Sequence, residues 1–508
     1  MTETRAPIRR KWWRTAAILT FAFLVLWAVS LPVISKIGFG RDKIARDLSA
    51  GTAGNVQFRS FRNVYFPHPG CVAEGITVRR KGSEGPPLIT IVRLTIIGSA
   101  LGIYRKHVSL MKAEGLQVTP GGEGWPASVN KSNVVIDRLV ANDAVLQVFY
   151  DDHNKPLNFK VHHFTLENIG DGAMPFHVEL SNPIPPGEIS ASGKLGPWNR
   201  EHREQTRISG SYSFQHADLS AIHGIGGLLS SDGKFQGTIR QLQVQGTTDT
   251  PQFEVVRTGH RFPLKTEFDA EVNATNGDVI LQHVEAKLVD TNLTAQGSIV
   301  PNPQGRRTAT LDFVAHNGRI QDILFPFVRG PRAPLNGVTS CHGRVLLPGG
   351  KEPFLRKVIL QADFGVADAR LTNPVKQRQL NKASERARGN PGDDDPANVV
   401  SDLKGQVALK DGVARFSKFS FQVPGALASM QGTFNVVDEH INLHGVVRLQ
   451  AKISQTTSGV KGFLLKAISP FLKKDKPQEP LPVAVTGTFD HPQYSVSLTK
   501  DNQHRRGM

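Results

Sequence analysis

Past residue 50, apolar side chains recur at every second position of this chain. The clearest stretch is INLHGVVRLQAKI, one face of which carries Ile441, Leu443, Gly445, Val447, Leu449, Ala451 and Ile453. Polar residues occupy the other face, with Val446 as the exception. Because successive side chains of a β-strand point to opposite faces of a sheet, this period predicts strands with one apolar and one polar face. The chain is therefore expected to be mainly β.

Asp-Gly and Asn-Gly pairs separate many of these stretches, and both residues of such a pair tolerate positive φ. The pairs expected to form hairpin turns lie at 171–172, 232–233, 276–277, 317–318, 336–337 and 411–412. Related segments such as LTAQGSIV and ASMQGTFNVV place a glycine before a small residue and a β-former, which predicts a bulge or bend. Together these signals predict a long antiparallel meander.

Alternation alone leaves two architectures open. In a closed β-sandwich the apolar faces of two sheets pack on one another. In an open curved sheet, one apolar face lines a groove instead. Composition by itself favours the sandwich.

The N-terminal segment has a different pattern. Residues 15–35, TAAILTFAFLVLWAVSLPVIS, carry no charge, and about 20 apolar residues suffice to cross a bilayer. Five basic residues precede this run, which predicts a cytoplasmic N-terminus and a bulk that lies across the membrane. A cleaved signal peptide ending near AVS is the alternative, but the apolar run is longer than such peptides need. We expect a single-pass membrane anchor.

A second departure from the period of two is GVKGFLLKAISPFLKK at 459–474. Steps of three and one place a helical apolar stripe on Val460, Phe463, Leu464, Ala467, Ile468, Phe471 and Leu472. With 16 residues, four lysines and Pro470, the segment is too short and too charged to span a bilayer. The expected short amphipathic helix could close the end of a groove, pack in a core, or lie on an anionic membrane surface.

The segment 373–398, NPVKQRQLNKASERARGNPGDDDPAN, is nearly free of apolar residues and is expected to be a disordered loop. Its three adjacent acids, Asp393 to Asp395, are expected to be solvated, so no metal site is predicted. The formal net charge of +17 favours anionic partners such as lipid headgroups. Without a clustered basic, aromatic or zinc motif, nucleic acid is not expected as a partner.

No recognisable catalytic arrangement occurs in the sequence. It lacks a nucleophile elbow, a phosphate-binding loop and an HExxH motif, so neither an enzyme nor a cofactor is predicted. His162 and His163 are adjacent in an expected strand and should point to opposite faces. The two cysteines, Cys71 and Cys341, could pair in an oxidising compartment or remain buried thiols.

From Leu403 onward the chain resembles a known family. The segment from LKGQVALKDGVARFSKFSFQVPG to GVKGFLLKAISPFLKK, followed by LPVAVTGTFDHPQYSVSL, resembles the C-terminal domain of AsmA-like proteins. SDGKFQGTIRQLQVQGTTDTPQFEV at 231–255 resembles the start of that domain. FRNVYFPHPGCVAEGITVRR and SALGIYRKHVSLMKAEGLQVTP resemble the N-terminal part of the family more loosely.

The resemblance implies a periplasmic protein anchored in the bacterial inner membrane and related to AsmA and TamB. Its long sheet would curl into a taco-like groove, which reverses the preference for a sandwich. The expected organisation is a cytoplasmic N-terminus and anchor at 1–36, an N-terminal periplasmic β domain at 37–225, an AsmA-like β domain at 226–500 and a tail at 501–508.

The resemblance also implies a function. Such proteins bind or conduct phospholipid and support outer-membrane assembly and lipid homeostasis, with no catalytic residues to carry over. Ile441, Leu443, Val447, Leu449 and Ile453 are the candidate groove-lining residues. A partner protein in the inner or outer membrane is a further expectation. The alternatives are a non-catalytic scaffold that assists outer-membrane protein assembly by strand pairing, and a hydrolase with an unrecognised site.

Overall fold

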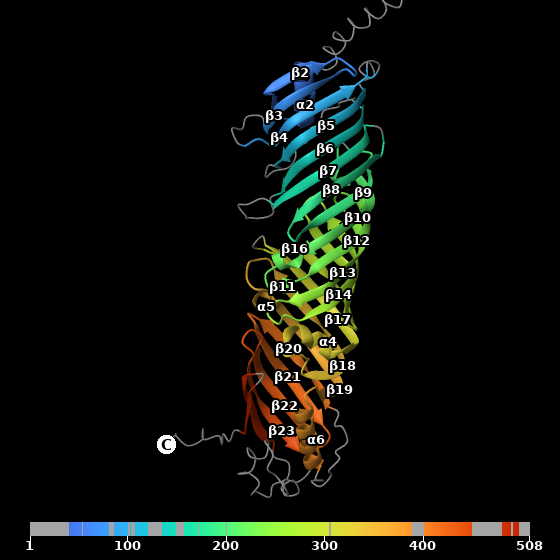
Figure 1. Cartoon of the computed structure of the whole chain (residues 1–508). Coiled ribbons are helices and arrows are strands. Elements are labelled where there is room, and N and C mark those ends of the chain that lie inside the picture. The colour runs from blue at the N-terminus through green and yellow to red at the C-terminus, as the bar shows by residue number, and fades with distance from the viewer. Residues whose placement is uncertain are drawn as a thin grey trace, which may run out of the picture. The chain divides into compact units, whose positions relative to one another are not determined.

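A computed structural model provides the structure of the chain (Figure 1). The residues that it describes are 40–52, 54–80, 86–99, 102, 107–119, 135–148, 157–170, 172–199, 201–303, 306–388, 401–449, 480–488 and 491–496. Of these, 69% are in strands and 10% are helical, which confirms a mainly β protein with a long sheet. The expected anchor, the expected amphipathic helix at 459–474 and Ile453 lie outside the described residues. Among the helices that are described, none is long and apolar enough to cross a membrane.

The chain divides into two compact units. The first comprises residues up to 214 together with 234–242, and the second comprises 215–233 together with the chain from 243 onward. The expected domain boundary at 225/226 falls in the segment 215–242, where the chain alternates between the two units.

The first unit is built on strands that follow one another along the chain. They are β1 (Gly54–Gln57), β2 (Ser60–Val64), β3 (Gly70–Arg80), β4 (Ile89–Gly98), β5 (His107–Val118), β6 (Val135–Val148), β7 (Leu157–Ile169), β8 (Met174–Pro183) and β9 (Pro186–Leu195). β1 and β2 both pair with β3, and each later strand pairs with the one before it. β5 and β6 pair in parallel, so the expectation of a purely antiparallel sheet is wrong at this point.

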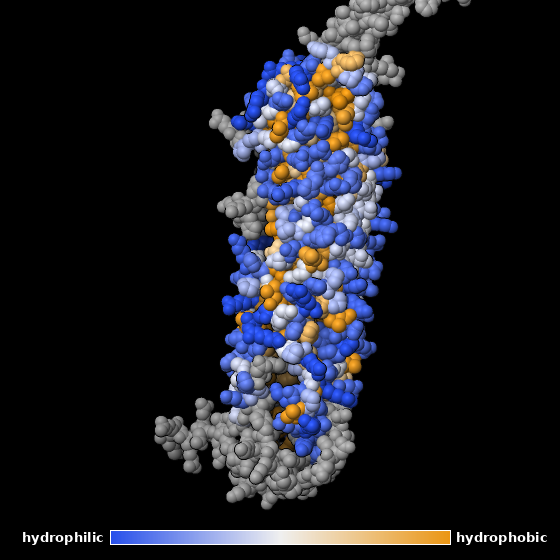
Figure 2. Space-filling view, viewed as in Figure 1, coloured by the Kyte–Doolittle hydropathy of each residue, from blue (hydrophilic) through white to orange (hydrophobic). Residues whose placement is uncertain are grey.

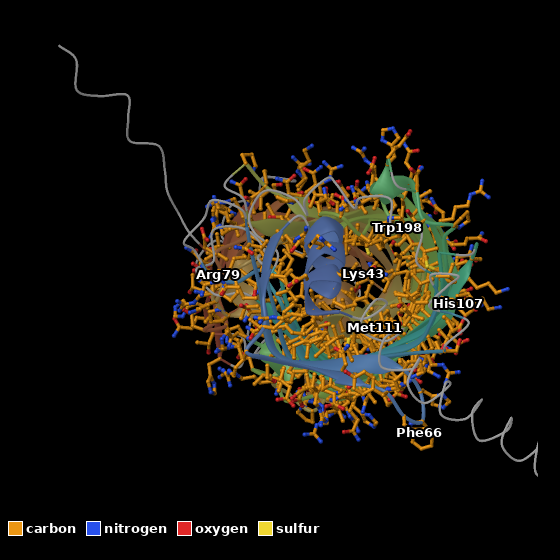
Figure 3. All side chains as sticks on the ribbon, turned by 90° about the horizontal axis from the view of Figure 1, so that it is seen from above. Lys43, Phe66, Arg79, His107, Met111 and Trp198 are labelled. Carbon is orange, nitrogen blue, oxygen red and sulfur yellow. The ribbon has the colours of Figure 1, made fainter. Side chains whose placement is uncertain are left out.

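The apolar core of the first unit lies between its sheet and helix α2 (Arg41–Thr52). Ile44 of α2 is buried with Cys71, Ile76, Leu94 and Ile96 from β3 and β4. Leu48, one helical turn after Ile44, also packs against this cluster. Viewed along the molecule, the sheet of this unit is curved and α2 lies on its inner side (Figure 3).

After β9 the chain continues with elements that are divided between the two units: η1 (Arg203–Gln205), β10 (Arg207–Asp218), η2 (Leu219–Ala221), β11 (Ile225–Gly226), β12 (Leu228–Thr238) and β13 (Leu242–Val255). The second unit continues with β14 (Arg261–Asn273), β15 (Asp278–Leu288), β16 (Thr291–Pro301), β17 (Arg307–Arg319), β18 (Leu335–Pro348), β19 (Ile359–Leu371), β20 (Ser401–Lys410), β21 (Val413–Val423), β22 (Ala426–Asn435), β23 (His440–Leu449), β24 (Leu481–Thr488) and β25 (Pro492–Val496). From β14 to β25, each strand is antiparallel to the next along the chain. This part of the protein is the expected meander.

The turn dipeptides have two different roles. Asn276-Gly277 and Asp411-Gly412 form the expected hairpin turns, at β14–β15 and β20–β21. In contrast, 232–233 lie within β12, 317–318 within β17 and 336–337 within β18, so the hairpin predictions there are wrong. The last two pairs lie at register shifts, with Asn317 at φ 52° and Gly337 at φ 157°. A β-bulge needs the same tolerance of positive φ as a hairpin turn, so the sequence signal does not separate the two.

The glycines of the related segments permit close strand approach. A Cβ on Gly297 would lie 1.9 Å from the carbonyl oxygen of Thr310, and a Cβ on Gly432 would lie 2.1 Å from that of Asn442. The neighbouring register shifts are on the facing strands, between Leu281 and Val284 and between Phe416 and Phe419. Each of these glycines therefore lies beside a bulge rather than within one.

Short helices connect strands of the second unit: α4 (Ile320–Leu324), η3 (Phe325–Phe327), α5 (Phe354–Lys357) and α6 (Pro374–Arg388). Helix α6 contradicts the expectation of a disordered loop at 373–398; residues 389–398 lie outside the described residues. The side chain of Asn373 accepts hydrogen bonds from the backbone N–H groups of Val375 and Lys376, and Pro374 occupies the first helical turn. The Asn-Pro pair is therefore a helix-start signal, which the low apolar content of the segment outweighed in the sequence prediction.

The buried face of α6 is polar, which explains how a segment so poor in apolar residues can be ordered. Gln377, Asn381, Ser384 and Glu385 are buried. The side-chain oxygen of Gln377 accepts a hydrogen bond from the backbone N–H of Leu371 at 2.7 Å, and the Ser384 hydroxyl donates to the carbonyl of Pro424 at 2.5 Å. Hydrogen bonds to strand ends thus replace the apolar contacts that usually hold a helix on a sheet.

The core of the first unit can be tested at Ile76, which is 1% exposed. We expect Ile76→Ala to lower the free energy of unfolding of this unit by about 2–5 kcal/mol, because the lost methyl groups leave a cavity. Native-state hydrogen exchange of the β3 and β4 amides would measure it. The control is Val92→Ala on the neighbouring strand, where the side chain is 67% exposed and a change within about 0.5 kcal/mol is expected. Equal effects of the two substitutions would contradict the assignment of this core.

Candidate functional site

The pairing register of the second unit aligns apolar residues into rows that cross the strands. One row runs from β15 to β25, strand by strand, through Val284, Ala295, Phe313, Gly343, Ala362, Val407, Phe416, Gly432, Leu443, Val485 and Tyr494. Directly opposed residues on neighbouring antiparallel strands share a face of the sheet. The row thus crosses eleven strands on one face, which we call the apolar face.

Two further rows run beside the first on the same face. One passes through Leu281, Gly297, Leu311, Val345, Leu360, Leu409, Ala414, Phe434 and Ile441. The other passes through Val366, Leu403, Phe421, Ala428, Val447 and Leu481. Leu449 pairs with Ala426, which pairs with Val423. The four candidate residues that the structure describes, Ile441, Leu443, Val447 and Leu449, therefore share the apolar face of β23.

Most side chains of the apolar face are half-buried, while Val366, Ala414, Val423 and Ala428 are buried. From Val284 to Val485, every residue of the row through Leu443 has intermediate exposure, while its strand neighbours Asn442 and His444 are exposed. In a closed sandwich, such rows pack against a second sheet and become core residues. Here the face keeps accessible apolar area along its length, which is the physical requirement for an apolar ligand.

Aromatic rings cluster on the apolar face around Phe416 of the row through Leu443. Phe364, Phe416 and Phe419 form a cluster with ring centroids 5.8–6.3 Å apart. At one margin of the face, Ile320 of α4 is buried with Val366 and Ala369. The face is therefore covered locally by α4, while α6 attaches to the ends of β19 and of the β21–β22 hairpin.

The opposite face of these strands is polar. A pocket of about 890 Å³ is lined by Gln296, Asp312, His342, Arg344 and Asp363 of this face, together with residues of the row through Leu443 such as Ala295, Phe313 and Val407. Arg344 donates from Nε and one terminal nitrogen to the two carboxylate oxygens of Asp312, at 2.6 and 2.9 Å. These hydrogen bonds hold the pKa of Asp312 below its usual range. The side of the molecule seen in Figure 2 is likewise mainly hydrophilic, so apolar ligands have no obvious place on it.

The histidine pair of β7 corrects a sequence expectation. A register shift between Val161 and His163 places both histidines on the polar side, where His162 hydrogen-bonds Ser181 at 2.6 Å and His163 hydrogen-bonds Asn142 at 2.9 Å. The prediction that they point to opposite faces is therefore wrong, because the bulge breaks the alternation. In the part of the chain that the structure describes, no three His, Cys, Asp or Glu residues are grouped as metal ligands would be.

Sequence reasoning missed most of the apolar rows outside β23. The alternation in β15, β17 and β21 is broken by bulges, so that Phe313 and Phe416 do not stand out by spacing. These rows could have been found by following the apolar–polar alternation separately before and after each bulge. The bulges lie near residues with positive φ, such as Asn317 and Lys418.

Comparison of the chain with protein-family models, curated proteins and solved structures found no match. The resemblance to AsmA-like proteins thus stays a prediction from the residues quoted above.

Both cysteines are free thiols in the structure. Burial raises the pKa of the Cys71 thiol to about 12, so at pH 8 about one molecule in ten thousand carries the reactive thiolate. Burial also raises the pKa of Cys341, which is more exposed than Cys71. We expect maleimide to modify native Cys71 at least about a hundredfold more slowly than after unfolding in urea, with Cys341 intermediate. Peptide mass spectrometry over a time course would measure both rates.

Mass spectrometry of the denatured, unreduced chain provides the control for this experiment. Two alkylated thiols are expected. A chain that accepts no label until it is reduced would instead show that Cys71 and Cys341 pair.

Proposed function

We propose that this protein binds phospholipid along the apolar face of its second unit, with the sheet curved into a groove and the chain anchored in the inner membrane. It is a non-catalytic lipid carrier of the bacterial envelope. Through this activity it supports outer-membrane assembly and lipid homeostasis.

The observation that carries the proposal is the half-exposed apolar row through Leu443. Ten strand spacings of about 4.8 Å separate β15 from β25, a run of roughly 48 Å. One leaflet of a bilayer has a hydrocarbon thickness of about 15 Å, half of the roughly 30 Å core. The row is thus longer than a single acyl chain and can hold lipids in succession.

The energetics favour acyl chains over other ligands. Each CH₂ group removed from water contributes about 0.8 kcal/mol, and a smooth row of aliphatic and aromatic side chains sets no fixed position along its length. A headgroup would remain in water at the open side of the groove. The ligand can therefore shift from strand to strand without losing its apolar contacts.

Location follows from the N-terminal segment. The uncharged run 15–35 after five basic residues supports an anchor with the bulk of the chain in the periplasm. The resemblance to AsmA-like proteins supports the same location and the same ligand class. A protein in the inner or outer membrane would receive or deliver the lipid at the ends of the sheet.

The proposal can be tested at two adjacent positions of β23 by a photoreactive amino acid in the full chain. Leu443 lies on the apolar face and Asn442 on the polar face of the same strand. Irradiation in cells should give a phospholipid adduct at position 443 and none at position 442, because only the former contacts acyl chains. Lipid mass spectrometry of the purified chain would detect the adduct. Because the adduct forms at residue 443, it is distinguished from lipid that surrounds the anchor.

Equal adducts at the two positions would argue against an oriented lipid path. The alternative function is a scaffold for outer-membrane proteins. Among the described strands, β25 pairs with β24, so the other edge of β25 is where a further strand would add. That function predicts protein adducts at Ser495 of β25 and no lipid adduct at 443.

A charge on the apolar face should block the path. We expect Leu443→Asp to reduce the lipid adduct formed by a photoreactive residue at position 416 several-fold, because a carboxylate there makes the contact with acyl chains unfavourable. Position 416 lies two strands away on the same row. Asn442→Asp adds the same charge on the polar face and should leave the adduct unchanged.

Circular dichroism and limited proteolysis of the two variants distinguish a blocked groove from a disrupted core. If Leu443→Asp unfolds the second unit while Asn442→Asp does not, the row is a packed core and the groove proposal fails.

A further inference from the structure

The loop between β2 and β3 carries two exposed aromatic residues in succession. Phe66 is 75% exposed and Tyr65 is 37% exposed. Figure 3 shows Phe66 projecting outward from the sheet, away from the inner side on which α2 lies. Exposing a phenylalanine to this degree costs hydrophobic free energy unless something covers it.

The loop is fixed at its base, so the aromatic pair is presented by a defined structure. The backbone N–H of Gly98 donates to the carbonyl of Pro69 at 2.8 Å. Gly70, the first residue of β3, is buried against β4, where a Cβ would lie 2.1 Å from the carbonyl oxygen of Ile96. Pro67 and Pro69 restrict the backbone of the intervening residues.

The loop lies at the terminal edge of the sheet, between two of the strands against which α2 packs. β1 and β2 both pair with β3 and precede every other strand of the first unit. Helix α2 begins at Arg41, and the uncharged run ends at Ser35. The five residues 36–40 span at most about 18 Å when fully extended, so a bilayer that holds the run must lie close to α2.

The charges at this end suit an anionic surface. Arg41 and Arg46 of α2, Arg59 before β2 and Arg62 of β2 are exposed, as are two acids, Asp42 of α2 and Glu74 of β3. The exposed arginines outnumber these acids. Basic side chains near an anionic leaflet are attracted to it, and aromatic residues are enriched at the membrane interface.

We infer that the Tyr65–Phe66 loop inserts into the interface of the anchoring membrane, with the exposed arginines of α2 and β2 attracted to anionic headgroups. This inference rests on the anchored orientation in the proposed function. It adds a second point of attachment, which holds the α2 end of the first unit on the bilayer instead of leaving it to swing on the anchor.

The test uses nitroxide spin labels on the full chain in vesicles of phosphatidylcholine with phosphatidylglycerol. One label is placed by Phe66→Cys, and the matched control by Ile184→Cys, another exposed apolar residue in a proline-rich turn (58% exposed). Both variants carry Cys341→Ser, and Cys71 is buried and free. Ile184 follows β8, six strand spacings or about 29 Å from β2, well beyond an interface roughly 5–8 Å thick.

We expect the label at position 66 to collide more with oxygen and less with a water-soluble nickel complex than the label at 184. The difference should shrink when phosphatidylglycerol is omitted, because the arginines then lose their anionic partners. A label at Tyr65→Cys, placed in the same way, should behave as the label at 66.

Two outcomes would overturn the inference. Equal accessibility of positions 66 and 184 would place the loop in water. A label at 66 that is immobilised and shielded from both oxygen and nickel would indicate a protein partner instead of lipid.

Separate measurements test the proposed anchor and the proposed lipid groove. Quenching of the native tryptophans at 12, 13 and 27 by brominated phospholipid reports insertion of the anchor. If the tryptophans are quenched but the spin label at position 66 is accessible to the water-soluble nickel complex, the anchor is inserted and the loop is not. That result would contradict the loop inference and leave the proposed anchor intact. The lipid adduct at position 443 is measured independently of both, so failure of the groove would leave the loop result intact.

Discussion

The cross-strand alignment of apolar side chains is the interaction on which the rest of this structure depends. In an antiparallel pair, directly opposed residues lie on the same face. The apolar side chains of successive strands therefore stay on one face of the sheet as long as the pairing register is kept. A slip of one residue in any pairing would move an entire strand's apolar set to the polar side. The register from β15 to β25 avoids this, and the row through Leu443 stays continuous across strands as different as β17 and β24.

Bulges preserve that continuity. They add residues such as Asn317 and Lys418 at positive φ and restore the phase of the alternation after each interruption. Glycines opposite the bulges let strands approach closely where a Cβ would collide with a carbonyl oxygen. The same devices increase local twist and bending, which is consistent with the curved sheet of the first unit.

The described helices contact the sheets only locally. Helix α2 contributes Ile44 and Leu48 to the core of the first unit, and α4 contributes Ile320 to a small cluster in the second. Helix α6 instead attaches by polar side chains to strand ends. The row through Leu443 nevertheless keeps intermediate exposure from Val284 to Val485, and this combination of order and accessibility supports a long apolar ligand.

The strand character of the chain and the shared face of Ile441, Leu443, Val447 and Leu449 can be predicted from the sequence, because a period of two is a local property. The sequence also predicted the hairpin turns at 276–277 and 411–412. It misassigned 317–318 and 336–337, the face of His163 and the segment of α6, because bulges and polar helix contacts depend on partners distant in the chain. Only the tertiary structure decided that Leu443 continues a row reaching Val284, since pairing register is set between strands and not within them. For the same reason, tertiary structure alone decided which apolar residues are covered and which, like Phe66, remain exposed.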